Sequence, residues 1–316
     1  MVKSATNSRA KTPAVTVVVA AYNMSRTLAY ALESIRAQTF RDFETLVIGD
    51  ASSDDCGLAV KKLRDRRFHW SNLPFNTGGQ WGPNNDGNKR ARGRYIAYLG
   101  QDDLWFPWHL SSLVETIQKS GADFAHSLVF LVGPDGKRLA CGLPSKGRSY
   151  LSGTFPPSGW LHRRQLAEEI GWWRGHDEIS QGTDVDFIRR VCLSGKSLKF
   201  SNAASVVKFP SAWWESYKAD ADVPQTRYFL AMKDDPHKLL NELLFGVAVE
   251  SAVQLSPVMS IVEAAKAAVG GLQLNLAEMY GRERWPLSSF LKWRFQRMRR
   301  RVRRQRGLPP LPGKNN

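Results

Sequence analysis

Short apolar runs that each end in a polar loop are the main pattern in the N-terminal third of the chain. Residues 14–21 form a continuous run rich in β-branched side chains, which is typical of a strand covered on both faces of a parallel sheet. Apolar positions at residues 28–35 follow helical spacing, and a second strand-like run at residues 43–48 leads into a polar loop that includes Asp50. Because ligands of open α/β sheets bind beyond the carboxyl ends of the strands, these loops predict a binding site.

A further strand-like run leads into two adjacent acids. Tyr95 to Leu99 are mostly apolar, and Asp102 and Asp103 follow directly after Gly100 and Gln101. Two carboxylates about 4 Å apart repel each other by roughly 4 kcal/mol at a protein surface, so such a pair is stabilised by a cation or by a shared proton. Carboxylate oxygens are ligands that Mg²⁺ and Mn²⁺ prefer, often together with substrate phosphates. The structural alternative is that the two acids cap the helix expected next.

The C-terminal part of the chain has a helical pattern. Residues 239–247 place their apolar side chains on one stripe and residues 262–269 on another, so helices packed on the α/β unit are expected. The best apolar stretch, residues 243–255, contains Glu250 and is short for a membrane span. The basic segment before Val15 has no apolar core, so no signal peptide is expected. Three cysteines without metal-like clustering indicate no disulfide framework, which favours a reducing, cytoplasmic setting.

A basic amphipathic segment lies near the C-terminus. Phe290 to Arg306 contain nine basic residues and no acid, in a chain with a formal net charge of +16. Apolar side chains are interleaved with the basic ones, so a helix here would lie on an anionic lipid surface, at about 1 kcal/mol per basic residue. Arginine-rich runs also bind nucleic acid, and a disordered solubilising tail is a third interpretation. No recognisable motif for reading nucleic acid accompanies the run.

Four sequence blocks occur in order along the N-terminal half. They are the opening strand with Tyr22-Asn23, the segment from Ala37 to Glu44, the loop from Gly49 to Asp54, and the series from Asn76 to Ile96 that runs into Leu99 to Asp103. Together they resemble the motifs of family 2 glycosyltransferases, which have the GT-A fold. The resemblance covers residues 12–215. It rests on the order and spacing of the blocks, because any one of them alone is weak.

The resemblance implies which residues would bind a nucleotide-sugar donor. Tyr22 and Asp50 would hold the nucleotide base, since a phenol ring can stack on a base and a carboxylate can accept its imide N–H. Asp102, with Asp103 beside it, would bind a divalent cation, Mn²⁺ or Mg²⁺, that neutralises the leaving diphosphate. The full predicted nucleotide-binding set is Ala21, Tyr22, Asn23, Asp50, Ser52, Asn76, Gly78, Asn85 and Gln101.

A third carboxylate, Asp184, resembles the family's acidic motif near the acceptor. Inverting sugar transfer needs a base that takes the proton of the acceptor hydroxyl while the leaving group departs from the opposite face. Asp184 is the predicted base. Asp186 lies two positions further along a predicted helix and does not share its face. We therefore interpret Asp186 as an acid of the first turn that stabilises the helix.

Several positions depart from the family pattern. Acids are usual where this chain has Gly49, Gly100 and Thr183, and an Arg is usual where it has Asn84. Members also often carry a His near residues 206–214, where this chain offers Lys208 and Ser211 instead. These departures leave open a nucleotide-sugar-binding protein without transfer activity, and the basic charge leaves open a nucleic-acid-binding protein.

The sequence therefore predicts an α/β protein with a GT-A, Rossmann-like mixed sheet flanked by helices and a C-terminal helical extension. The expected boundaries are a flexible N-terminus at 1–12, a catalytic domain at 13–215, a helical extension at 216–281 and a basic amphipathic tail at 282–316. The resemblance implies an inverting, metal-dependent transfer of sugar from a nucleotide-diphosphate donor to a saccharide or lipid-linked acceptor, in cell-surface polysaccharide biosynthesis. With Phe290 to Arg306 on anionic lipid, the protein is expected at the inner face of the cell membrane, without a nucleic acid partner.

Overall fold

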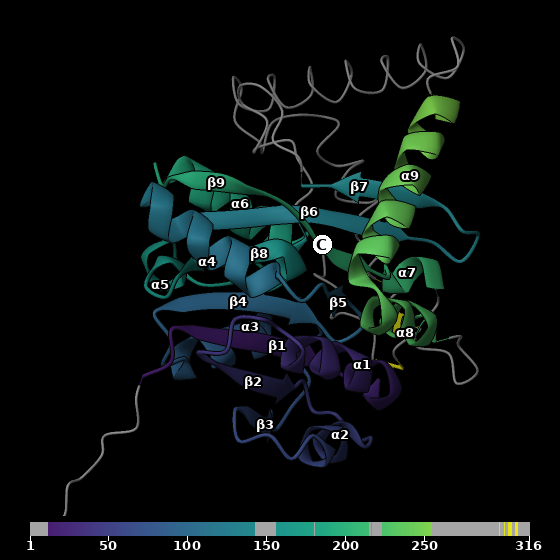
Figure 1. Ribbon diagram of the computed structural model, residues 1–316. Helices are drawn as coiled ribbons and strands as arrows, with labels where there is room; N and C mark the ends of the chain where they lie inside the picture. Colours follow the sequence, from purple (N-terminus) through teal and green to yellow (C-terminus); the bar gives the residue numbers. More distant parts are fainter. Residues whose placement is uncertain are drawn as a thin grey trace, which may run out of the picture.

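One mixed sheet of nine strands organises the part of the chain that the computed structural model describes, namely residues 12–142, 156–179, 181–214, 216, 223–254, 297, 300, 303, 304, 307 and 308 (Figure 1). The strand order is β3-β2-β1-β4-β8-β6-β9-β5, and β7 pairs with β6. The strands are β1 (Val15–Ala21), β2 (Phe43–Gly49), β3 (Phe68–Asn72), β4 (Tyr95–Gly100), β5 (Leu104–Trp105), β6 (Phe124–Val132), β7 (Arg138–Cys141), β8 (Trp160–Arg163) and β9 (Leu198–Lys208).

The strands β3, β2, β1 and β4 are parallel and carry the predicted ligand-binding edge. In the pairing register, Ala21 lies opposite Gly49, and Gly49 lies opposite Asn72. On the other side of β1, Ala20 lies opposite Gly100. The four strands therefore end nearly level, and the polar loops that follow them open at the same edge of the sheet. This is the arrangement that the apolar runs predicted.

The second half of the sheet brings the end of β9 to the same edge. β8 is antiparallel to β4 and to β6, and β9 runs parallel to β6. The short strand β5 pairs antiparallel with β9, so that Leu104 lies opposite Val207. This pairing places Asp103, the residue before β5, beside Lys208 at the end of β9.

Helices cover both faces of the sheet, and alternate side chains of β1 divide between the two faces (Figure 1). Val15, Val17 and Val19 pack with α1 and α4, whereas Val18 packs in a second cluster with α6. The near-complete burial of β1 explains its continuous apolar run. The helices are α1 (Ser25–Arg36), α2 (Cys56–Lys62), α3 (Trp81–Arg90), α4 (His109–Ser120), α5 (Leu166–Glu169), α6 (Thr183–Leu193), α7 (Ser211–Trp214), α8 (Gln225–Asp234), α9 (Pro236–Gln254) and the 3₁₀ helix η2 (Pro157–Gly159).

The helices α8 and α9 form the C-terminal helical region that the sequence predicted. Tyr228 and Met232 of α8 and Leu239 and Leu243 of α9 pack against the apolar face of β5, β6 and β9. Among the described residues, no helix is both long enough and apolar enough to cross a membrane. The helical pattern at residues 262–269 and most of the basic tail lie outside the described residues, so the domain boundaries stay predictions.

One sequence block of the family resemblance has a structural role. Glu44 is buried at the start of β2 and accepts hydrogen bonds from the Thr16 hydroxyl at 2.7 Å and from the Arg92 Nε at 2.7 Å. Burial by itself would raise the pKa of Glu44, but the hydrogen bonds from Arg92 and Thr16 outweigh it and lower that pKa. A side chain at Gly93 would collide with the backbone of Thr16. These contacts fix the entry into β4, which positions the acids at its far end.

Candidate functional site

Asp50 anchors the loop between β3 and α3 at the carboxyl edge of the sheet. Its Oδ1 accepts hydrogen bonds from the backbone N–H and the hydroxyl of Thr77, both at 2.8 Å. Asn76 donates from its Nδ2 to the Asp50 carbonyl at 2.6 Å and accepts from Gly78 N–H at 2.8 Å. Asp50 is 4% exposed. The predicted residues Asp50, Asn76 and Gly78 therefore lie in one hydrogen-bonded unit.

The loop after β1 is held by the loop after β4. Gln101 accepts a hydrogen bond from Tyr22 N–H at 2.6 Å and donates to the Tyr22 carbonyl at 3.1 Å. Asn23 has a left-handed backbone with φ 43° and accepts from Ser53 N–H at 2.7 Å. The Ser52 hydroxyl donates to the Ala21 carbonyl at 3.3 Å. Ala21, Tyr22, Asn23, Ser52 and Gln101 are thus brought together, as the sequence predicted for one binding edge.

The glycine at position 49 leaves room for a side chain that sequence reasoning missed. A methyl group at Gly49 would collide with the side chain of Asn72 at the end of β3. Asn72 accepts from Ser52 N–H at 2.9 Å and donates to the Ser52 carbonyl at 2.8 Å. An amide of β3 therefore stabilises the loop at the position where the family usually has an acid. No local sequence signal could have identified Asn72, because its role depends on the pairing of β2 with β3.

Asp103 is a buried ion-pair partner. Its carboxylate is fully buried and accepts hydrogen bonds from Ser158 Oγ at 2.5 Å, Lys208 Nζ at 2.9 Å and Phe209 N–H at 3.2 Å. Both carboxylate oxygens are engaged by protein donors. The prediction that Asp103 ligates a metal does not fit these contacts, because a cation would have to displace the Lys208 ammonium. The adjacent acids thus have different contacts.

Lys208 lies where three predicted site carboxylates converge. Burial would lower the pKa of Lys208, but the negative charges of Asp103, Asp102 and Asp184 outweigh it and raise that pKa above its ordinary range. The lysine therefore stays an ammonium ion at neutral pH. A methyl group at Gly100 would lie 2.7 Å from Asp103 Oδ2 and 3.1 Å from Asp102 Oδ1, so an acid at position 100 would crowd both carboxylates.

Asp102 is the remaining candidate metal ligand of the pair. It is 9% exposed, and its backbone carbonyl accepts a hydrogen bond from Gln225 Nε2 of α8 at 2.9 Å. In the described part of the chain, no group of three or more His, Cys, Asp or Glu side chains is arranged to hold a metal ion. Mg²⁺ is commonly held by one or two carboxylates together with substrate phosphates. Asp102 fits that mode, in which the substrate supplies most of the oxygen ligands.

Asp184 lies in the first turn of α6, half-buried. Its Oδ1 accepts a hydrogen bond from Val185 N–H at 3.0 Å. Burial raises the pKa of Asp184, and the Val185 N–H and the charge of Lys208 oppose that shift without cancelling it. The preceding residue, Thr183, accepts a hydrogen bond from Gln80 Nε2 at 3.3 Å, which joins the start of α6 to the start of α3. A more basic carboxylate therefore lies next to the loop that Asp50 anchors.

Asp186 and Asn85, which the sequence analysis also singled out, hold neighbouring parts of the structure in place. Asp186 forms ion pairs with Arg190 at 2.8 Å and Arg174 at 3.9 Å, which agrees with its structural interpretation. Asn85 donates to the Trp173 carbonyl at 2.8 Å and accepts from Trp173 N–H at 2.9 Å. The Asn85 amide thus holds the segment that follows α5, and Trp173 itself is buried in the core.

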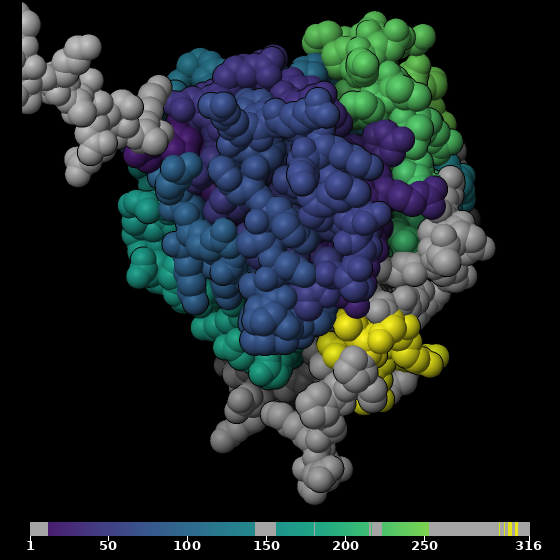
Figure 2. Space-filling model, turned by 90° about the horizontal axis from the view of Figure 1, so that it is seen from below, coloured from purple at the N-terminus to yellow at the C-terminus, as the bar shows by residue number. Residues whose placement is uncertain are grey.

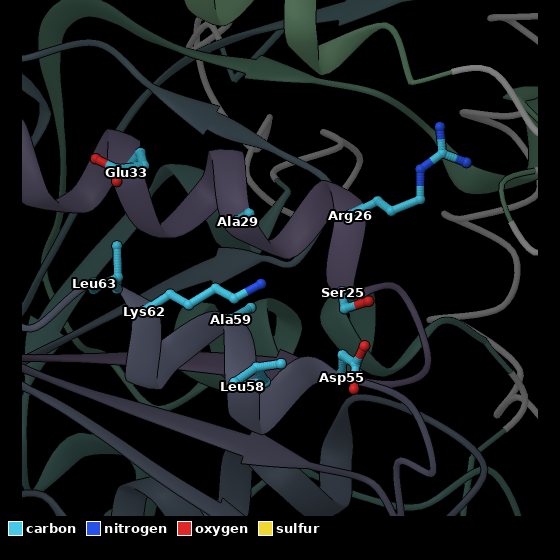
Figure 3. Close-up of a pocket in the computed structure, with 9 residues that line it drawn as sticks. All are labelled: Ser25, Arg26, Ala29, Glu33, Asp55, Leu58, Ala59, Lys62 and Leu63. Carbon is cyan, nitrogen blue, oxygen red and sulfur yellow. The ribbon is translucent and has the colours of Figure 1, made fainter.

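A groove between α1 and α2 is separate from this constellation (Figure 3). It has a volume of about 300 Å³ and is lined by Ser25, Arg26, Ala29, Glu33, Asp55, Leu58, Ala59, Lys62 and Leu63. None of the predicted nucleotide, metal or base residues contributes to its lining. The groove therefore adds nothing to the candidate site.

Part of the chain is similar to a known family and to curated proteins. The sequence model described as glycosyl transferase family 2 matches residues 16–147. The chain is 38% identical over 129 residues to the succinoglycan biosynthesis protein ExoO of Rhizobium meliloti (strain 1021), covering 41% of this chain and 37% of that protein. It is 30% identical over 117 residues to the UDP-Glc:alpha-D-GlcNAc-diphosphoundecaprenol beta-1,3-glucosyltransferase WfaP of Escherichia coli, covering 37% of this chain and 46% of that protein. The chain thus spans less than half the length of these two relatives.

A solved structure supports the fold. The crystal structure of S. aureus TarS 1-349 in complex with UDP-GlcNAc matches with a TM-score of 0.53 at 21% identity, over 69% of this chain and 70% of that one. At this identity the match concerns the fold alone. The level strand ends and the mixed sheet agree with the GT-A architecture that the sequence blocks predicted. Residues 16–147 are therefore similar to glycosyl transferase family 2, and the described fold is similar to that of TarS.

Proposed function

We propose that the protein is an inverting glycosyltransferase that moves a sugar from a nucleotide-diphosphate donor to a saccharide or lipid-linked acceptor. The observation that carries the proposal is that Asp50 and Asp102 follow parallel strands that end at one edge of the sheet, where the Lys208 ammonium interacts with the charges of Asp102 and Asp184. A role in cell-surface polysaccharide biosynthesis is supported by the names of the relatives ExoO and WfaP.

Each carboxylate has a separate task in the proposed reaction. Asp50 and Tyr22 bind the base of the nucleotide, and the loop from Asn76 to Gly78 closes around it. A divalent cation, Mn²⁺ or Mg²⁺, would be held by Asp102 and the donor's diphosphate, where it would neutralise charge on the leaving group. Asp184 takes the proton of the acceptor hydroxyl. The acceptor oxygen bonds to the anomeric carbon as the bond from that carbon to the diphosphate breaks, so the nucleoside diphosphate leaves and the configuration inverts.

The donor is identified by a binding screen. Thermal shift with a panel of nucleotide sugars, each with and without Mn²⁺, is expected to show stabilisation by one base class, because a ligand that binds only the folded state raises the melting temperature. Binding of a donor without any transfer to saccharide or lipid-linked acceptors would favour the alternative, a nucleotide-sugar-binding protein. The absence of binding by every member of the panel would contradict the proposed function.

Asp102→Asn is expected to weaken donor binding in Mn²⁺ and to leave the melting temperature of the unliganded protein nearly unchanged. The substitution keeps the shape of the side chain but removes the charge that would hold the cation. Calorimetry in Mn²⁺ and in EDTA measures the effect, with Asp135→Asn, an exposed turn residue, as the control. An affinity of Asp102→Asn in Mn²⁺ equal to that of the wild type would show that Asp102 is not a metal ligand.

We further propose that Phe290 to Arg306 binds anionic membrane, which would place the enzyme at the inner face of the cell membrane. Replacement of Trp293 and Phe295 by Ser is expected to reduce co-sedimentation with phosphatidylglycerol vesicles, since both apolar contact and charge contribute. High salt is expected to reduce it further, because exposed charges are screened beyond about 8 Å at physiological ionic strength. Unchanged co-sedimentation of the double variant would contradict this proposal. It would favour a tail that binds only through charge, or a disordered tail.

A further inference from the structure

An arginine of the basic tail lies at the candidate donor site. Arg303 is partly buried, and a methyl group built on Gly78 would collide with its Nη1 and lie 3.7 Å from its Cζ. Its guanidinium therefore covers the backbone of Gly78, although the two residues are far apart in the sequence. Figure 2 shows the described C-terminal residues, in yellow, at the border of the face that the N-terminal part of the chain forms.

Gly78 belongs to the loop that connects the two halves of the candidate site. The loop is fixed to Asp50 through Thr77, and two residues further Gln80 reaches Thr183, the neighbour of Asp184. Gly78 has φ +84°, a backbone conformation that side chains disfavour, and the absence of a side chain lets the guanidinium approach closely. Arg303 thus contacts the loop that joins the proposed base-binding residue to the helix of the proposed catalytic base.

Besides the divalent cation proposed at Asp102, a positively charged side chain in the described site would favour binding of a diphosphate. Asp50, Asp102 and Asp184 are acidic, and the Lys208 ammonium is paired with Asp103 at 2.9 Å. A diphosphate that enters beside these carboxylates meets repulsion that Lys208 alone does not offset. A guanidinium presents a planar set of donors that matches two phosphate oxygens at once, and it stays charged at every physiological pH.

We propose that Arg303 is a donor-binding residue that contacts the diphosphate of the nucleotide sugar across Gly78. The proposal rests on the proposed function and adds to it a residue from outside the segment that matches the family. It also gives the basic tail a role at the reaction site, beside its proposed role at the membrane.

The test compares nucleoside diphosphates with nucleosides. Calorimetry in EDTA uses UDP, GDP, ADP, CDP and dTDP, together with the nucleoside that matches whichever diphosphate binds, so that no bound metal contributes. Arg303→Ala is expected to weaken binding of the diphosphate about 10- to 100-fold, the size of a charged hydrogen bond, and to leave binding of the nucleoside unchanged. The affinity of Arg303→Lys for the diphosphate should lie between those of the wild type and Arg303→Ala, because lysine keeps the charge and loses the paired donors.

The neighbouring arginine provides the matched control. Arg304 is exposed, and its Nε donates to the Arg300 carbonyl at 3.4 Å. Arg304→Ala removes the same charge from the tail and is expected to bind the diphosphate as the wild type does. Equal weakening by both variants would indicate a general charge effect and overturn the proposal.

A double-mutant cycle tests the contact with Gly78 itself. Gly78→Ala is expected to displace the guanidinium and to weaken diphosphate binding, but to have a smaller effect when Arg303 is already Ala. Losses of diphosphate affinity that add up in the double variant would overturn the proposal. Tighter binding by Arg303→Ala would also overturn it, because the arginine would then obstruct the site. If the wild-type protein binds a diphosphate and Arg303→Ala binds it equally, only this inference fails. If the wild-type protein binds none of the five in EDTA, this inference fails, and if it also binds none of them in Mn²⁺, the proposed function fails with it.

Discussion

Asp184→Asn is expected to lower turnover by about 10²- to 10⁴-fold, the usual contribution of a general base. The amide keeps the size of the side chain and cannot take the proton of the acceptor hydroxyl. Donor affinity should stay near the wild-type value, because Asp184 is proposed to act on the acceptor. Initial rates at saturating acceptor and calorimetry of donor binding measure the two effects separately.

The pH profile provides a second readout for the same residue. Burial raises the pKa of Asp184, so its carboxyl stays protonated to a higher pH than the ordinary value of about 3.9 for Asp. A base must be deprotonated to act, so kcat is expected to fall as the pH decreases through this raised pKa. The acid limb of the profile should therefore lie at a higher pH than an unperturbed Asp would give, and its loss in Asp184→Asn would assign the limb to this residue.

Asp186→Asn is the control for Asp184→Asn, because it removes a carboxylate from the same turn of α6. It breaks the ion pair with Arg190 and is expected to reduce stability while turnover at moderate temperature stays close to that of the wild type. Turnover of Asp184→Asn within about threefold of the wild type would rule Asp184 out as the base.

Asp103→Asn is expected to lower the free energy of unfolding by about 3 kcal/mol, the lower end of the range for breaking a buried ion pair. The lower end applies because the Lys208 side chain is 26% exposed, whereas that of Asp103 is fully buried. The ammonium of Lys208 would lose its nearest counter-charge and would have to deprotonate or recruit water. Urea unfolding at neutral pH measures the change.

A second substitution separates the charge from the packing. Combining Asp103→Asn with Lys208→Met removes the unpaired ammonium, so it should recover part of the lost stability. No recovery in the double variant would mean that the hydrogen bonds of Asp103 to Ser158 and Phe209, rather than the ion pair, account for the loss. A loss below about 1 kcal/mol in the single variant would place the pair among weak surface ion pairs.

The strands that form the binding edge were predictable because their signal is local. Each of β1, β2 and β4 is a short apolar run buried by its own pairing, and each ends in a polar loop. The position of a ligand site beyond level parallel strands follows from that order alone. The helical region of α8 and α9 was predictable for the same reason, since its apolar stripe recurs at helical spacing.

The different contacts of Asp102 and Asp103 were not predictable from the dipeptide. The two residues are of the same type and have nearly the same sequence neighbours. They differ in the side chains that contact them from distant parts of the chain. Ser158 reaches Asp103 from the 3₁₀ helix η2, and Lys208 reaches it from the end of β9. The same holds for Asn85, whose amide is engaged by the backbone of Trp173.

The sequence by itself determined the three strands β1, β2 and β4, the resemblance of the N-terminal half to a known family, and the edge at which chemistry is expected, because periodicity and motif spacing are properties of neighbouring residues. Only the tertiary structure decided which carboxylate is engaged by a lysine, why Gly49 makes room for Asn72, and which loop Arg303 covers. These outcomes depend on pairings between distant segments of the chain. The ion-pair partner of a side chain depends on which distant segment packs beside it, and the local sequence does not specify that segment.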